Sequence, residues 1–151
     1  MEFKIISMGL ENVDEVSEVE KECFYTAWTK QDFIKEMTEN KLAVYFIAVS
    51  EGKIIGYAGM WHIIDEGHIT NIAVLPEYRR HKVGSALVQK LVDTAKQRNM
   101  TGLTLEVRIG NIAAQKLYSN YGFKAEGIRK KYYSDTGEDA VIMWKRQAVQ
   151  E

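Results

Sequence analysis

The hydrophobic positions of this chain follow two periods, one typical of β-strands and the other of α-helices. Short β-branched and aromatic runs predict strands at residues 3–7, 43–49, 54–63, 68–75 and 103–107. Apolar residues spaced three or four apart predict helices at residues 12–24 and 82–99, and capping residues predict helices at 30–38 and 111–121. A final hairpin is predicted from residues 123–132 and 139–144 around a turn at 134–137. The predicted order is therefore β-α-α-β-β-β-α-β-α-β-β.

Polar and turn-forming residues mark the ends of these elements. Thr29 and Asp32 have the spacing of a capping box, and Asn111 can cap the helix that follows it. Gly122 stands where a helix commonly ends, and Pro76, the only proline, ends the strand before it. Three consecutive strands followed by β-α-β crossovers predict an α/β fold with a mixed sheet and helices on both faces.

Length and composition narrow the class of protein. The 151 residues fit one domain, 1–151, and the net charge of -1 gives no general nucleic-acid or membrane signal. The start of the chain lacks a signal-peptide core and no segment reaches the length of a membrane span, so a cytoplasmic location is expected. The single cysteine, Cys23, is expected to be a small buried side chain. The three histidines do not have a metal-binding spacing, and no metal is expected.

The densest positive charge lies just before the helix that starts near residue 82. It consists of Arg79, Arg80, His81 and Lys82. The first N–H groups of a helix lack helical partners and attract anions, and Gly84 would let a phosphate approach the backbone closely. The alternative is a solvated basic turn that opens an ordinary helix. A Walker-type phosphate loop is absent, which argues against a nucleotide kinase.

Several motifs, in the correct order over nearly the whole chain, resemble the GCN5-related N-acetyltransferases (GNAT). The turn from Arg79 to Gly84 resembles their Gln/Arg-x-x-Gly-x-Gly/Ala motif. The segment from Leu105 to Phe123 looks like the second half of that fold. The closing segment resembles the branch that acetylates protein amino termini, through Tyr132, Tyr133, Glu138, Asp139, Ala140 and Met143.

The chain departs from the family pattern at two positions. Ala27 stands where relatives often carry proline, and Lys82 replaces the first glycine of the motif. If that position requires a positive φ, the lysine is strained; if it does not, the lysine adds a cation beside the pyrophosphate.

The resemblance implies that acetyl-CoA is the acetyl donor. In this family a splayed pair of parallel strands, here 68–75 and 103–107, admits the pantetheine arm. The backbone of Ile72, Ala73 and Val74 is then expected to bind the arm, with Asn111 and Tyr118 near its thioester end. The pyrophosphate is expected at Arg79, Arg80, His81, Lys82, Val83, Gly84 and Ser85.

The resemblance also implies transfer to the α-amino group of a protein, an N-terminal alanine of a small-subunit ribosomal protein. That amine has a pKa of about 8, so it must lose a proton before attack. Glu106 is the candidate base, directly or through a water, and Tyr118 is the candidate acid. The alternatives are a solvent-facing glutamate paired with Arg108 and a core tyrosine. At the level of function, the alternatives are a small-molecule amine acetyltransferase and a non-catalytic acyl-CoA-binding module.

The acceptor peptide is expected to bind between aromatic side chains. Trp28, in the loop between the first two helices, and Tyr132 and Tyr133, on the final hairpin, are the candidate walls. Aromatic residues in hairpins also serve ordinary packing.

Overall fold

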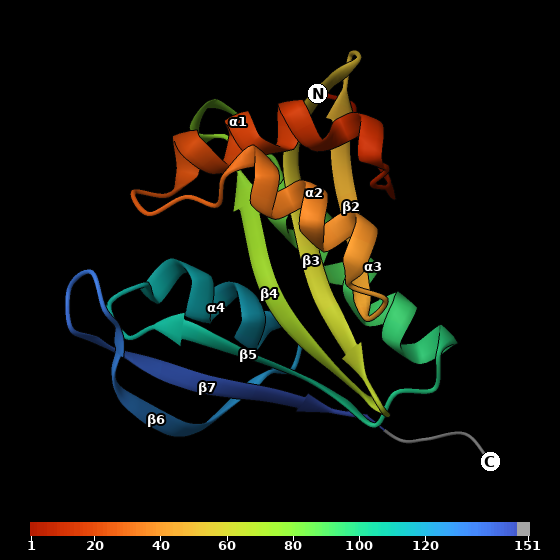
Figure 1. Cartoon of the computed structure of the whole chain (residues 1–151). Helices are drawn as coiled ribbons and strands as arrows, with labels where there is room; N and C mark the ends of the chain where they lie inside the picture. The colour runs from red at the N-terminus through yellow and green to blue at the C-terminus, as the bar shows by residue number, and fades with distance from the viewer. Residues whose placement is uncertain (148–151) are drawn as a thin grey trace.

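A seven-stranded sheet lies at the centre of the computed structural model, which describes residues 1–147 (Figure 1). The elements are β1 (Lys4–Ser7), α1 (Val13–Cys23), α2 (Lys30–Glu39), β2 (Ala43–Ser50), β3 (Lys53–Ile63), β4 (Glu66–Val74), α3 (Val83–Gln97), β5 (Gly102–Arg108), α4 (Ile112–Asn120), β6 (Lys124–Tyr133) and β7 (Glu138–Arg146). Short 3-10 turns precede α1 and follow β4. This is the predicted order of elements. The last four residues of the expected domain 1–151 lie outside the described residues.

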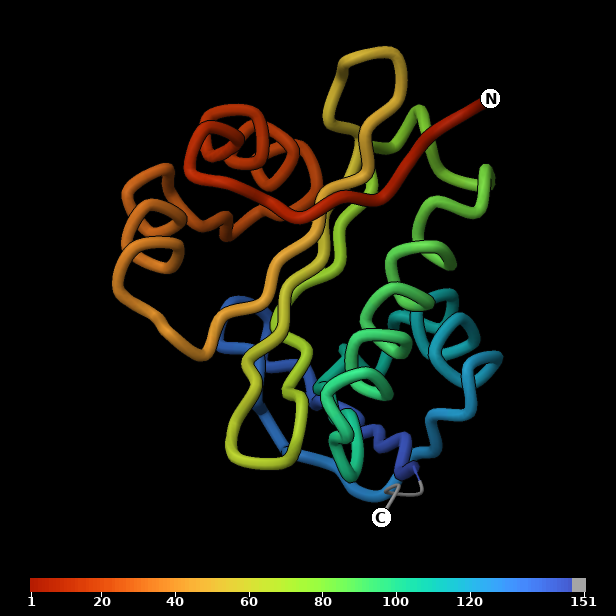
Figure 2. The backbone as a smooth tube through the Cα atoms, turned by 90° about the vertical axis from the view of Figure 1, so that its right-hand side faces the viewer, coloured from red at the N-terminus to blue at the C-terminus, as the bar shows by residue number. Residues whose placement is uncertain are grey.

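The sheet is mixed, and helices cover both of its faces. Its strand order is β1-β2-β3-β4-β5-β7-β6, and β4 with β5 is the one parallel pair among the described strands. Helices α1 and α2 lie on one face, and α3 and α4 lie on the other (Figure 2). The α/β fold predicted from the sequence, with a mixed sheet and helices on both faces, is confirmed, and the sheet is mostly antiparallel.

Strands β4 and β5 pair only at the start of each strand and then diverge (Figure 1). The paired residues are Glu66–His68 and Gly102–Thr104. Shortly after the last pair, β4 has a bulge, because Ile69 lies opposite Met60 and Asn71 opposite Gly59. Such an extra residue, here at position 70, bends and twists a strand. Beyond this bulge the facing edges of the two strands have no strand partner on that side, which opens the sheet in a V.

Two apolar cores hold the sheet to its helices. On the α3 and α4 face, Leu87 and Leu91 of α3 and Leu103 of β5 belong to one apolar cluster, and all three are fully buried. On the other face, Phe33 of α2 meets Tyr57 of β3 edge to face, with ring centroids 5.6 Å apart. Burying each such side chain contributes about 1.5–3 kcal/mol. The core under α3 and α4 therefore holds the strands on both sides of the V, and the core under α1 and α2 also holds β4 on its other face.

Local signals in the sequence set most helix ends as predicted. The Thr29 hydroxyl accepts a hydrogen bond from the Asp32 N–H, and the Asp32 carboxylate accepts one from the Thr29 N–H. The Asn111 side chain accepts from the Ala114 N–H at the start of α4, and Gly122 follows that helix with φ +91°. Among the described residues, none of the helices is long and apolar enough to cross a membrane.

Gly67 has a packing role in a strand. The β3–β4 turn falls at Ile64 and Asp65, whereas Gly67 lies inside β4. A Cβ on Gly67 would lie 2.5 Å from the side chain of Leu103. Gly67 therefore allows β4 to approach β5 where the two strands pair, and it is not a turn residue.

Lys82, which stands where the family motif has its first glycine, adopts the left-handed conformation. It is the residue before α3, with φ +65° and ψ +19°, and Arg80 has φ +67°. Lys82 therefore bears the strain of a positive φ, and it also lines the cleft described below, so the two alternatives for this residue do not exclude each other.

We predict that Lys82→Gly does not destabilise the fold and raises its free energy of unfolding by up to about 1.6 kcal/mol. Left-handed geometry costs a non-glycine residue about 1–2 kcal/mol, and the extra freedom of glycine in the unfolded chain offsets about 0.4–1 kcal/mol of this. Urea unfolding measures the difference. Lys82→Ala removes the amine but keeps the Cβ, so it should show no gain. An equal gain in both variants would contradict backbone strain at this position.

Candidate active site

A cleft of about 750 Å³ lies beside the diverging half of β4, between the start of α3 and α4. This volume is in the range of small-molecule sites. It is lined by most of the residues predicted to bind the acetyl donor: Ile72, Ala73, Val74, Arg79, Arg80, Lys82, Val83, Gly84, Ser85, Asn111 and Tyr118. His81 is exposed and does not line the cleft with its neighbours. Cys23 and Phe24, at the end of α1, also line this cleft.

One end of the cleft suits an anionic group. Helix α3 begins there, and the first hydrogen bond back to Lys82 comes from the Ala86 N–H. The N–H groups of residues 83–85 therefore have no helical partner, and the helix dipole adds positive potential. A Cβ on Gly84 would meet protein atoms only at ordinary contact distances, 3.5 Å from Leu117 and 3.9 Å from Val74. The packing of the protein does not demand glycine here, and the missing side chain leaves the backbone open on the cleft side.

Tyr118 presents a buried phenol to the same cleft. It lies on α4 with 9% of its surface exposed, and its ring centroid is 5.8 Å from that of Phe123. Burial raises the pKa of Tyr118 to about 12. The phenol is therefore protonated throughout the neutral range, as a proton donor must be. Tyr118 is a core aromatic and a cleft residue at once, so the two alternatives from the sequence do not exclude each other.

Glu106 forms a close pair with a histidine on the neighbouring strand. Its Oε2 lies 2.8 Å from Nε2 of His68, and its Oε1 lies 3.6 Å from Nε of Arg129. The hydrogen bond from His68 lowers the pKa of the Glu106 carboxyl, and the same bond raises the pKa of the His68 imidazole. Glu106 does not line the cleft that contains Tyr118. It lies just beyond the last β4–β5 pair, at the closed end of the V.

The sequence indicated Glu106 but not its partner. Arg108, the partner considered from the sequence, instead binds Asp135 at 2.8 Å and lies 4.0 Å from the ring centroid of Tyr133. His68 pairs with Thr104 across the parallel strands, which brings it beside Glu106 two residues further on. The sequence did place a histidine on one predicted strand and a glutamate on the other, which was the only indication of this pair. The register of β4 and β5 brings the two side chains together, and the sequence does not give that register.

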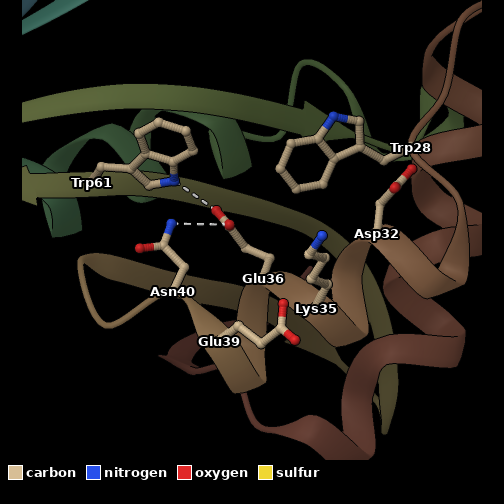
Figure 3. A pocket seen from close by; sticks show the side chains of 7 residues that line it. All are labelled: Trp28, Asp32, Lys35, Glu36, Glu39, Asn40 and Trp61. Atoms are coloured by element: carbon tan, nitrogen blue, oxygen red, sulfur yellow. Dashed lines mark hydrogen bonds between the residues drawn. The ribbon is translucent and has the colours of Figure 1, made fainter.

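The structure does not bring the three predicted acceptor-binding aromatics into one cavity. The Trp28 ring packs on Phe33 with ring centroids 5.3 Å apart, and the Trp28 backbone N–H donates to the buried Glu20 carboxylate at 2.9 Å. It lines a second cavity, between α2 and β3 (Figure 3). Tyr132 and Tyr133 lie on β6, edge to face with ring centroids 5.1 Å apart. Their binding role stays a prediction.

Comparison with known proteins gives the class of this chain. The Acetyltransferase (GNAT) family matches residues 13–123. A Bacillus subtilis (strain 168) protein provisionally named ribosomal protein bS18-alanine N-acetyltransferase is 44% identical over 138 residues, 91% of each chain. The Escherichia coli (strain K12) protein named ribosomal protein bS18-alanine N-acetyltransferase is 36% identical over 127 residues, 83% of this chain and 84% of that one.

A solved structure agrees over the full length. The crystal structure of the ribosomal-protein-S18-alanine N-acetyltransferase from Escherichia coli superposes with a TM-score of 0.91 at 31% identity, covering 99% of this chain and 97% of that chain. The sheet, the cleft and these matches define an acyltransferase. The chain belongs to the GNAT family of N-acetyltransferases.

We predict that NMR titration finds the His68 imidazole pKa above its ordinary value of about 6.5 and that Glu106→Gln lowers it. The carboxylate stabilises the imidazolium, and the amide of glutamine does not. Glu126→Gln, which removes an exposed carboxylate paired with Arg146, is the matched control and should leave the titration of His68 in place. A pKa that is the same in wild type and Glu106→Gln would contradict the pair.

The same pair should make stability depend on pH in a set direction. The raised pKa of His68 contributes stability that is present below its unfolded value and is lost as pH rises through the folded value. His68→Asn should therefore cost more free energy of unfolding near pH 5.5 than near about pH 9. Urea unfolding at the two pH values measures this, and a larger cost at the higher pH would contradict it.

Proposed function

We propose that this enzyme transfers the acetyl group of acetyl-CoA to the α-amino group of a protein, with the N-terminal alanine of a ribosomal protein as acceptor. The names of two relatives that align over more than four-fifths of this chain support this acceptor. A ribosomal acceptor also favours a cytoplasmic location. The observation that carries the chemistry is the Glu106–His68 pair at the closed end of the V, beside a cleft that contains Tyr118.

The cleft suits acetyl-CoA at both of its ends. The three free N–H groups at the start of α3, with Arg80 and Lys82 beside them, would hold the pyrophosphate. The edge of β4 that lacks a strand partner, at residues 72–74, would hydrogen-bond the amides of the pantetheine arm as an added strand does. The thioester would then lie towards Tyr118 and the narrow end of the V. Bound there, acetyl-CoA supplies the activated acyl group.

Glu106 and His68 would remove the proton that blocks the acceptor amine. At neutral pH an α-amino group is mostly ammonium. The lowered pKa of Glu106 keeps its carboxylate ionised, so it attracts the ammonium and orients it. The proton then passes to the pair, either to neutral His68 or to Glu106 through a water. The pair works best above the raised pKa of His68, where the imidazole can accept a proton.

Tyr118 would complete the transfer at the other side of the reacting carbon. The amine nitrogen forms the new C–N bond as the C–S bond of the thioester breaks, and the sulfur leaves with the bonding electron pair. The Tyr118 O–H gives its proton to that sulfur, so that free CoA leaves as a thiol. The proton taken up by the Glu106–His68 pair then returns to the phenol through solvent. Acid and base thus act from two different elements, α4 and the β4–β5 pair.

We predict that Tyr118→Phe lowers kcat at least about tenfold, because a positioned acid is typically worth about 10²–10⁴-fold. The phenyl ring keeps the packing against Phe123, so the binding of acetyl-CoA, measured by calorimetry, should change little. Tyr25→Phe, at a fully exposed tyrosine, is the matched control and should keep full activity. Unchanged turnover in Tyr118→Phe would remove this residue from the mechanism.

The acceptor class is tested by giving the enzyme acetyl-CoA with peptides that begin with alanine, the same peptides with blocked amino termini, and free polyamines. Mass spectrometry measures the acetylation of each acceptor, and we expect only the unblocked peptides to be acetylated. Turnover confined to free amines would instead indicate a small-molecule acetyltransferase.

A further inference from the structure

Two buried tyrosines lie beside the bulge of β4, and the proposed mechanism uses neither of them. Tyr57 of β3 is fully buried, and Tyr45 of β2 has 5% of its surface exposed. Their rings lie nearly parallel in the core under α1 and α2, with ring centroids 6.4 Å apart. A buried phenol normally has a hydrogen-bond partner. The partners of these two hydroxyls therefore show what the side chains hold in place.

Each hydroxyl donates to a buried glutamate on a different helix. The Tyr57 O–H donates to Oε1 of Glu20 in α1 at 2.5 Å, and the Tyr45 O–H donates to Oε2 of Glu36 in α2 at 2.8 Å. Burial raises the pKa of both phenols well above the ordinary value of about 10, so both remain donors. Hydrogen bonds to a charged acceptor are stronger than neutral ones. The two rings are therefore fixed relative to α1 and α2.

The same two hydroxyls reach the bulge of β4. The Tyr45 Oη lies 3.5 Å from Oγ1 of Thr70, the extra residue of the bulge. The side chain of the next residue, Asn71, hydrogen-bonds the Tyr57 hydroxyl. Because each phenol proton is already given to a glutamate, the phenol oxygens act as acceptors toward the bulge. Two successive residues of β4 are thus each tied to a fixed phenol.

A glycine opposite the bulge makes room for one of these ties. Gly59 of β3 pairs with Tyr45 on one side and with Asn71 on the other. A Cβ on Gly59 would lie 2.3 Å from the Tyr45 ring, which is closer than any side chain tolerates. The Tyr45 ring therefore lies across β3 at this position. The missing side chain of Gly59 lets a phenol of β2 reach β4, although β3 lies between these two strands.

Glu20 also holds the loop that borders the donor cleft. Its second oxygen, Oε2, accepts a hydrogen bond from the Trp28 backbone N–H at 2.9 Å. The same loop follows Cys23, which lines the cleft together with Phe24. The Cys23 thiol lies 3.4 Å from the Val74 carbonyl on the free edge of β4. One buried carboxylate thus connects the bulge, through Tyr57, to the loop beside that edge.

We propose that Glu20 and Tyr57, supported by Tyr45 and Gly59, are positioning residues that hold the free edge of β4 in the orientation that binds the pantetheine arm. The proposal rests on the proposed function and adds the residues on which the affinity for acetyl-CoA depends. None of these four described residues lines the donor cleft, so they act through the bulge. The proposed base lies before the bulge, because His68 still pairs with β5. These residues should therefore set donor affinity and leave the rate of transfer from bound donor unchanged.

The first test is Tyr57→Phe, which keeps the ring and removes the hydroxyl. We expect the Kd for acetyl-CoA, measured by calorimetry, to rise at least about fivefold, as the loss of one buried hydrogen bond predicts. The kcat at saturating acetyl-CoA should change by less than about twofold, because binding and not transfer is affected. Ser17→Ala is the matched control. It removes a buried hydroxyl of α1 that bonds only within the helix, to the Asp14 carbonyl at 3.0 Å, and should leave both values unchanged.

A double variant separates positioning from stability. Tyr57→Phe leaves the buried Glu20 carboxylate without one of its donors, which lowers the free energy of unfolding. Adding Glu20→Gln removes the buried charge, and the glutamine carbonyl can still accept from the Trp28 N–H. The double variant should regain stability in urea over Tyr57→Phe, but its Kd should stay raised because no hydroxyl holds Asn71. A merely structural role predicts that affinity returns with stability.

Asn71→Ala keeps the test decisive if Tyr57→Phe disturbs folding. This change leaves the buried pair of Glu20 with Tyr57 in place and removes only the partner in the bulge. Asn71 does not line the donor cleft, so no direct contact with acetyl-CoA is lost. The Kd should rise at least about threefold.

The outcomes distinguish this proposal from the proposed function. A wild-type Kd in Tyr57→Phe, or in Asn71→Ala where Tyr57→Phe does not fold, would overturn the positioning role and leave the proposed function standing. Recovery of both stability and affinity in the double variant would overturn it as well. Failure of the wild-type protein to bind acetyl-CoA would overturn the proposed function and the positioning role together.

Discussion

The separation of β4 from β5 after a short stretch of parallel pairing is the constraint on which the rest of this structure depends. The pairing stops at His68 and Thr104, and the bulge at position 70 turns β4 away. Two cores prevent the sheet from closing again, because α1 and α2 hold β4 on one face while α3 and α4 hold the strands on the other. The divergence leaves backbone hydrogen-bonding groups without strand partners inside a folded domain. Such groups need partners, and a ligand with amides of its own can supply them.

The V also separates the charged groups by role. Its open part leads to the basic turn at the start of α3, where an anion is favoured. Its closed end carries Glu106, whose carboxylate is kept ionised by His68 and Arg129 and therefore favours a cationic amine. Tyr118, buried on α4, remains a neutral donor. An anionic donor molecule and a cationic acceptor can thus approach one reacting carbon from different sides without competing for the same charges.

Local patterns were sufficient to predict the elements and part of the site. The capping residues Thr29 and Asn111 and the helix end at Gly122 act through neighbours in the sequence, so their roles followed from spacing alone. The pair of Glu106 with His68 did not, because it depends on the register of two strands joined by a helix. The positive φ of Lys82 contradicts the usual preference of lysine, and no propensity predicts it. The cavity around Glu36 and Trp61 likewise exists only once α2 packs on β3.

The central claim, that acetyl-CoA binds along the free edge of β4, is tested most directly by amide hydrogen exchange with and without acetyl-CoA. We expect acetyl-CoA to slow exchange at residues 72–74 and 83–85 and to leave exchange in the β6–β7 hairpin unchanged. Unchanged exchange at residues 72–74 in protein saturated with acetyl-CoA would contradict the claim.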